Sequence, residues 1–161
     1  MKAKKLALCG LLTALALVLS YLESLVPLSF SVPGVKLGLP NLAILFALYK
    51  LGFKEAAVIS LIRVLLVSLL FGNVFSLAYS AAGAALALAI MGLLQRSGRF
   101  GTAGVSVAGA VAHNVGQILV AMAVLETGAI AAYLPVLLLT GTAAGVAIGL
   151  VSAVLINRVK V

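Results

Sequence analysis

The chain has 161 residues, of which 65% are apolar and only 9% are charged, and its mean hydropathy is +1.33. So few charged residues cannot cover a soluble domain of this length, and the apolar runs are too long and too frequent for buried soluble helices. The net charge of +8 comes from small basic clusters between apolar runs, which excludes a nucleic-acid-binding stripe and is typical of a membrane protein.

The apolar runs predict six helices in one domain that spans residues 1–161. In chain order the predicted helices cover residues 6–21, 40–49, 54–70, 76–94, 102–125 and 131–156. A long segment, residues 22–39, joins the first two helices and contains Pro27, Pro33 and Gly34. We therefore predict an all-α integral membrane protein, a compact bundle of six transmembrane helices of which five are long enough to span the bilayer.

Basic residues gather on one side of this topology. Nine of them lie there: Lys2, Lys4, Lys5, Lys50, Lys54, Arg96, Arg99, Arg158 and Lys160. The opposite side carries only one basic residue, Lys36, together with Glu23 and Glu126. Because positive residues in short loops stay on the cytoplasmic side, we expect a multi-pass protein of the bacterial cytoplasmic membrane with both termini in the cytoplasm.

The second predicted helix is too short to span a membrane. Its apolar run, residues 39–51, has 13 residues, whereas a full span takes about 20. Lys50 and Lys54 hold its end at the cytoplasmic surface, so the helix should begin near Pro40 inside the membrane, after a re-entrant loop. Such a start would present unpaired N–H groups and a positive dipole end to an anion in a cavity. A short tilted helix without a ligand is the alternative.

Arg63 lies about 13–14 Å into the third predicted helix, near the bilayer centre. A charge at that depth must face a partner or water. An internal ion pair or backbone carbonyls would satisfy it, and so would a ligand anion, which is the interpretation we prefer.

A polar layer lies at the same depth as Arg63 in the fifth predicted helix, where His113 and Asn114 are followed by Gln117 one turn later. A lone buried histidine is as often structural as functional. Combined with nearby cations and hydroxyls, however, this layer predicts a site for an anionic headgroup whose remainder is partly lipophilic. The candidate substrate-binding residues are Lys36, Asn41, Arg63, Tyr79, His113, Asn114 and Gln117.

Catalytic motifs are absent from the sequence, which has no nucleophile–base pair and no phosphate-binding glycine loop. It contains no Asp, three scattered Glu residues, one His and one Cys. Chemistry on diphosphates usually needs clustered carboxylates to hold Mg²⁺. We therefore expect a chain that is not an enzyme by itself and that has no metal site and no cofactor.

Several motifs follow one another along nearly the whole chain. They are residues 33–41 (PGVKLGLPN), 52–56 (GFKEA), 68–72 (SLLFG), 112–117 (AHNVGQ) and 133–135 (YLP), with Arg63, Tyr79, Ser80 and Gly83 between them. This series resembles the Gx transporter family, also labelled heptaprenyl diphosphate synthase component I. The resemblance implies a fold similar to the S components of energy-coupling-factor transporters, which bind nutrients near the outer face and pair with a transmembrane coupling subunit and two ATPases. By that analogy Lys36, Asn41, Arg63, His113 and Gln117 line the cavity.

Docking in such S components usually uses an Ala-x-x-x-Ala pair on the first helix. Here the corresponding small residues are Ala3, Ala7, Gly10 and Ala14, which share one helical face. The resemblance therefore implies that this face is the one that docks on a coupling subunit.

Two functions remain open. The first is a transport-class protein that binds a prenyl diphosphate, a quinone-related compound or a vitamin-like nutrient in an outward-facing cavity. The second follows from the older family label, which implies a part in making the heptaprenyl chain of menaquinone. Without Asp to hold Mg²⁺, this chain would be a non-catalytic accessory subunit or anchor. It would recruit a soluble prenyl synthase or a redox partner through the basic loops at residues 50–55 and 96–99.

Overall fold

The computed structural model describes residues 2–26 and 36–159, which form six α-helices and a 3₁₀-helix. In order these are α1 (Lys2–Leu25), α2 (Asn41–Lys50), α3 (Phe53–Phe71), α4 (Val74–Ser97), α5 (Thr102–Val124), η2 (Gly128–Tyr133) and α6 (Leu134–Arg158). The predicted all-α fold is confirmed for these residues. Pro27, Pro33 and Gly34 of the predicted re-entrant loop lie outside the described residues.

Local capping explains where the helices differ from the predicted ranges. Helix α4 is longer at both ends, because the Asn73 side chain accepts a hydrogen bond from the Ser76 N–H at 2.8 Å, and Gly98, at φ 65°, ends the helix. Helix α1 is also longer than predicted, by four residues at each end.

The predicted last helix lies within one continuous helical segment, Gly128–Arg158, whose first part is a 3₁₀-helix and not an α-helix. Residues 131–133 belong to η2, and α6 begins at Leu134 with a proline in its first turn. That proline, Pro135, would clash with the carbonyl of Ala131 in a continuous α-helix, so the α-helical geometry cannot extend further back along the chain.

Four helical segments of the described chain are long and apolar enough to cross a membrane: α1, α4, α5, and η2 continued by α6. The fifth expected span, α3, has 19 residues but carries Lys54, Glu55 and Arg63. Large apolar side chains point outward over much of the bundle; Leu69 is 78% exposed and Val74 is 80% exposed. Since water would disfavour so much exposed apolar surface, lipid is the solvent, and the chain is an integral membrane protein.

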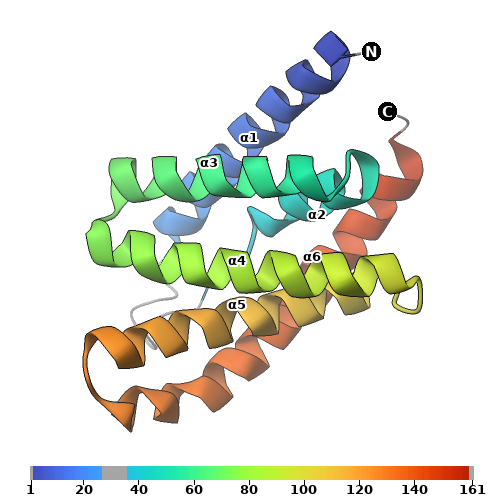
Figure 1. The fold of residues 1–161 in the computed structure, drawn as a ribbon. Coiled ribbons are helices and arrows are strands. Elements are labelled where there is room, and N and C mark those ends of the chain that lie inside the picture. The colour runs from blue at the N-terminus through green and yellow to red at the C-terminus, as the bar shows by residue number, and fades with distance from the viewer. Residues whose placement is uncertain (1, 27–35, 160–161) are drawn as a thin grey trace.

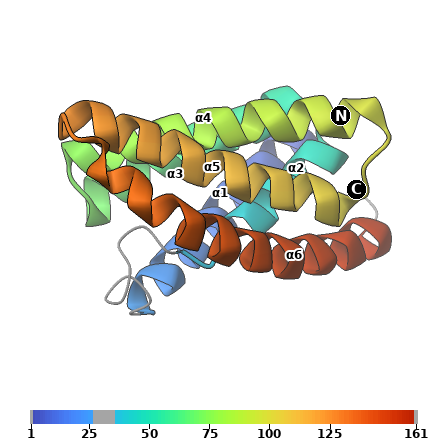
Figure 2. The same ribbon diagram turned by 90° about the horizontal axis from the view of Figure 1, so that it is seen from below.

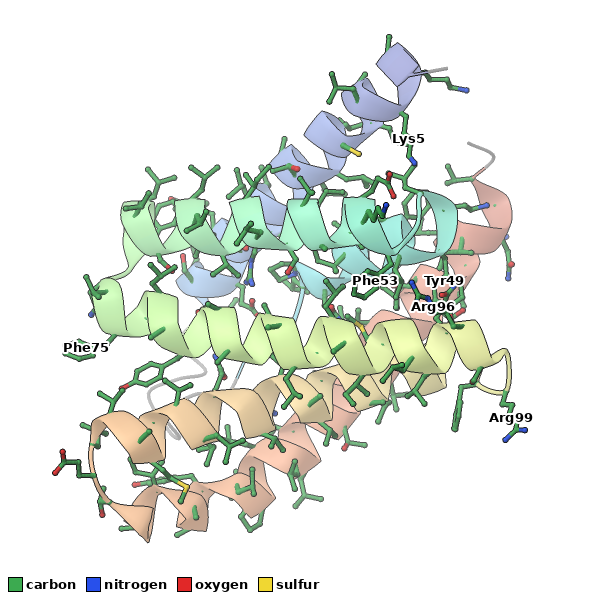
Figure 3. The ribbon with its side chains drawn as sticks, viewed as in Figure 1. Lys5, Tyr49, Phe53, Phe75, Arg96 and Arg99 are labelled. Carbon is green, nitrogen blue, oxygen red and sulfur yellow. The ribbon has the colours of Figure 1, made fainter. Side chains whose placement is uncertain are left out.

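Helices α4, α5 and α6 pack side by side as antiparallel neighbours, while α1 slants across α3 and its N-terminal part extends beyond the other helices (Figures 1 and 2). Both described ends of the chain lie at the same end of the bundle as the turns between α2 and α3 and between α4 and α5. Figure 3 shows Lys5, Arg96 and Arg99 at this end, which we call the basic end, and Phe75 at the opposite end.

Helix α2 occupies the middle of the bundle, where it contacts α1, α3 and α6. Six consecutive residues, Ala43, Ile44, Leu45, Phe46, Ala47 and Leu48, are buried. A helix that is apolar on every side is suited to such a central position. Its ten residues span about 15 Å, roughly half of a 30 Å hydrocarbon core. The predicted short second helix is therefore confirmed to within one residue, and it fills only the half of the bundle near the basic end.

Candidate functional site

A cavity of about 90 Å³ lies where α2 begins. Its wall comes from the end of α1, the residues just before α2, and the middle of α3, α4, α5 and α6. The polar lining residues are Glu23, Lys36, Asn41, Ser60, Arg63, His113 and Asn114. A single water needs about 10–15 Å³ of such space, so the cavity has room for several waters or a small polar group but not for a whole isoprenoid chain.

The cavity lies midway along the long helices. Arg63 is ten residues after the first residue of α3 and eight before the last, and His113 is eleven residues from either end of α5. At 1.5 Å per residue both side chains start about 15 Å from the basic end of their helices. The polar side chains of Arg63 and His113 therefore lie at similar heights, near the middle of their helices.

Arg63 is held from α1 by a hydroxyl group. Its Nε donates to Ser20 Oγ at 3.0 Å, and that hydroxyl donates to the Ala16 carbonyl at 2.7 Å. Among the described residues the one ion pair within 4 Å joins Lys5 and Glu55 at the basic end. A guanidinium has five N–H donors and is always charged, so the Ser20 contact leaves Arg63 with a full charge and unused donors. The described residues therefore provide no ion-pair partner for Arg63 within 4 Å, contrary to the alternative of an internal ion pair.

Glu23 links the end of α1 to the segment before α2. Its Oε1 accepts a hydrogen bond from the Gly38 N–H at 2.5 Å. Gly38 has a φ of 72°, a left-handed conformation that glycine adopts without strain. The contact fixes a carboxylate beside the two cations of the cavity.

The first N–H groups of α2 are not free. Those of Asn41, Leu42 and Ala43 donate to the carbonyls of Gly38, Leu39 and Pro40, at 2.9, 3.1 and 3.2 Å. The prediction of unpaired N–H groups at this helix start is therefore wrong, because a tight turn before the helix supplies the acceptors. An anion would therefore be attracted by the side chains and by the helix dipole, and not by unpaired N–H groups.

Two neighbouring residues of α5 are packed against adjacent helices. Asn114 Nδ2 donates to the Leu137 carbonyl of α6 at 2.6 Å, in a notch left by Gly141. The His113 ring lies over Gly83 of α4, where an added Cβ would come within 3.0 Å of Cε1. Both side chains thus help to join α4, α5 and α6, and both also line the cavity.

Comparison with known proteins identifies one family, and the matched part of the chain includes every residue of the cavity wall. The sequence matches the family described as heptaprenyl diphosphate synthase component I over residues 12–155. The chain belongs to that family. No curated protein and no solved structure matches the chain.

The fold brings five of the seven candidate residues together on the cavity wall: Lys36, Asn41, Arg63, His113 and Asn114. Tyr79 and Gln117 are not among the lining residues. Gln117 lies one turn after His113, where its Cγ packs against Gly83. His113 and Gln117 share a helical face, but only His113 lines the cavity, because α4 covers Gln117.

Sequence reasoning missed two polar contributions to this cavity. Ser60 is buried and lines it one turn before Arg63, so the spacing of three residues could have indicated it. Glu23 also lines the cavity, and the sequence holds no signal for its contact with Gly38. Among the described residues no group of three or more His, Cys, Asp or Glu side chains is close enough to hold a metal ion.

The four candidate docking residues lie on α1. Ala3, Ala7, Gly10 and Ala14 are all exposed, on the face opposite to the buried Leu12. Three of them precede the range that matches the family.

Proposed function

We propose that this chain is a transport-class protein that binds an anionic, partly lipophilic small molecule in the cavity at the start of α2. The observation that carries the proposal is the pair of cations, Lys36 and Arg63, on the cavity wall. Neither has an ion-pair partner within 4 Å among the described residues. A charge near the bilayer centre costs about 3 kcal/mol or more unless it is compensated, and a bound anion would compensate it.

The position of the cavity mouth supports binding from outside the cell. Lys36 and Leu37 are the exposed residues of the lining, and they precede α2 at the end remote from the basic end. If the basic end lies in the cytoplasm, as the charge asymmetry favours, the mouth faces outward and both termini lie inside. This arrangement is the one expected of a protein similar to S components in a bacterial cytoplasmic membrane.

The ligand classes that fit are prenyl diphosphates, quinone-related compounds and vitamin-like nutrients. The polar residues would hold the charged head, while Ile44, Leu88 and Ile148 provide an apolar wall. The small volume means that only the head and the first part of a longer molecule would lie inside.

Thermal stabilisation of the purified full chain in detergent tests the anion site. We expect at least one anion among these classes to raise the melting temperature of the wild type and to lose most of that effect with Arg63→Gln. Arg99→Gln removes the same charge from an exposed turn and should keep the full effect. If no anion stabilises the wild type more than Arg63→Gln, the proposed site does not exist.

The exposed small face of α1 would dock on a transmembrane coupling subunit that works with ATPases. Because Ala7 and Ala14 contact no other described helix closely enough to be buried, Ala7→Trp and Ala14→Trp should block co-purification of that subunit without lowering thermal stability. Leu15→Trp serves as the control and should leave co-purification unchanged, because Leu15 is also exposed but lies about 100° around the helix from Ala14. Unchanged co-purification with both tryptophan variants would refute this docking face.

A second function is supported by the family description itself. As one component of a heptaprenyl diphosphate synthase, the chain would be a non-catalytic membrane anchor for a soluble prenyl synthase. Its basic end offers a surface for such a partner. Purification from native membranes separates the two functions, since a coupling subunit with ATPases favours transport and a prenyl synthase favours the anchor.

A further inference from the structure

Three charged side chains line the cavity, and they form one electrostatic cluster. The Glu23 carboxylate attracts both Lys36 and Arg63, and the two cations repel each other. The other polar lining residues, Asn41, Ser60 and Asn114, carry no charge. With His113 neutral, as an imidazole ordinarily is at pH 7, the lining has a net charge of +1.

The negative member of this cluster is fixed in place. Glu23 is held by its hydrogen bond to the Gly38 N–H, and Gly38 in turn accepts the N–H of Asn41 at the start of α2. The carboxylate cannot turn away from an incoming ligand without losing this contact. An anion that approaches Lys36 and Arg63 therefore meets the charge of Glu23 as well.

The charge of the ligand decides whether this cluster favours or opposes it. A ligand with one negative charge leaves the occupied cavity neutral. A phosphate monoester already carries about 1.5 to 2 negative charges at pH 7, and a diphosphate carries more. Excess negative charge would then remain at membrane depth, where it is weakly screened and repelled by Glu23. The described residues contain no carboxylate cluster that would bring Mg²⁺ to offset it.

We propose that Glu23 makes the cavity selective for ligands with a single negative charge, such as carboxylates, and against diphosphates. This selectivity rests on the proposed function and narrows its ligand class. The product named in the family description, heptaprenyl diphosphate, would then not be the ligand of this cavity, because its diphosphate head carries too much negative charge. The neutral donors of Asn41, Ser60 and Asn114 complete the polar surroundings of a carboxylate.

A matched pair of ligands tests the charge rule directly. 3-Methylbut-2-enoate and dimethylallyl diphosphate share the same branched unsaturated skeleton and differ in their head. Their dissociation constants are measured by calorimetry on the full chain in detergent, with EDTA present so that Mg²⁺ does not alter the ligand charge. We expect the wild type to bind the carboxylate at least about tenfold more tightly than the diphosphate.

Glu23→Gln removes the charge but keeps an amide oxygen that can accept the Gly38 N–H. Since repulsion grows with ligand charge, this variant should gain more affinity for the diphosphate than for the carboxylate and reduce the wild-type preference by about tenfold or more. Glu126→Gln makes the same change of charge at an exposed position after α5 and should leave the preference unchanged.

The outcomes separate this selectivity from the anion site itself. A wild-type preference for the diphosphate, or a preference that Glu23→Gln does not move, overturns the charge rule while leaving the anion site intact if Arg63→Gln still abolishes binding. If neither ligand binds the wild type more tightly than Arg63→Gln, the charge rule fails, and the proposed function fails with it when no other anion stabilises the wild type in the thermal assay. The wild-type comparison needs no variant, so it decides the matter even if Glu23→Gln does not fold.

Discussion

The two halves of the helix bundle differ in what occupies their centre. Near the basic end, α2 fills the centre with six consecutive buried apolar residues. Toward the other end α2 is absent, and the middle of α3, α4, α5 and α6 surrounds a cavity with charged and polar side chains. The surrounding helices run through both halves (Figure 1). A central helix half the length of its neighbours is therefore enough to leave a polar cavity within an otherwise ordinary membrane bundle.

The two halves should respond very differently to the loss of a leucine. Leu45 is fully buried in α2, so Leu45→Ala leaves a void among packed helices and should cost about 2–5 kcal/mol of unfolding free energy. Leu88→Ala enlarges a cavity that is already open and should cost less. Leu69→Ala, on the lipid-facing surface, should cost least. Thermal unfolding in detergent gives the order, and equal losses at Leu45 and Leu88 would contradict the distinction between a filled and an open half.

Close helix approach in the filled half gives the second largest effect. A Cβ on Gly149 of α6 would lie 2.5 Å from the Ala103 Cα of α5, so Gly149→Ala must push the two helices apart and should cost about 1–3 kcal/mol. Gly104→Ala is the matched control in α5, because its nearest contact is 3.8 Å away and alanine favours a helix. Unfolding measurements that show equal effects for both variants would argue against close packing of α5 on α6.

In the open half, removing a charge should stabilise the protein. Arg63→Leu replaces a guanidinium that has no ion-pair partner within 4 Å among the described residues with an apolar side chain, which should raise the free energy of unfolding of the ligand-free protein by about 1–3 kcal/mol. The same variant should lose anion binding. The measurement is thermal unfolding without ligand, with Arg99→Leu as an exposed control. A large loss of stability would instead mean that Arg63 neutralises a negative charge of the protein itself.

The smallest effect compares two glycines with the same backbone conformation. Gly38 has φ 72° and Gly98 has φ 65°, and nothing lies within 4 Å of a Cβ added to either. Alanine at each position should therefore cost about 1 kcal/mol of conformational strain. Gly38→Ala should in addition reduce the preference for a carboxylate over a diphosphate, because strain at this residue loosens the contact that holds the repelling Glu23 carboxylate in place, whereas Gly98→Ala at the basic end should not. An equal preference in both variants would show that the Glu23 contact does not shape the site.

The sequence by itself determined the helical membrane fold and the element that creates the cavity. Charge density and long apolar runs leave lipid as the only compatible solvent, and a run of 13 apolar residues cannot become a full span. The depth of Arg63 and His113 also followed from counting residues along a helix. These properties depend on composition and on distance along the chain, which a sequence contains directly.

Only the tertiary structure decided which side chains meet in the cavity. Helices α4 and α6 are apolar on all sides, so no pattern in them indicates which face turns inward. Their rotation is set by close contacts such as Gly83 with His113 and Gly141 with Asn114, and Tyr79 of α4 and Gln117 of α5 stay out of the cavity wall. The bond between Glu23 and Gly38 joins residues fifteen positions apart, across a loop whose path the sequence does not specify. Contacts of this kind depend on how helices fit together in space, so they could not be predicted from their order along the chain.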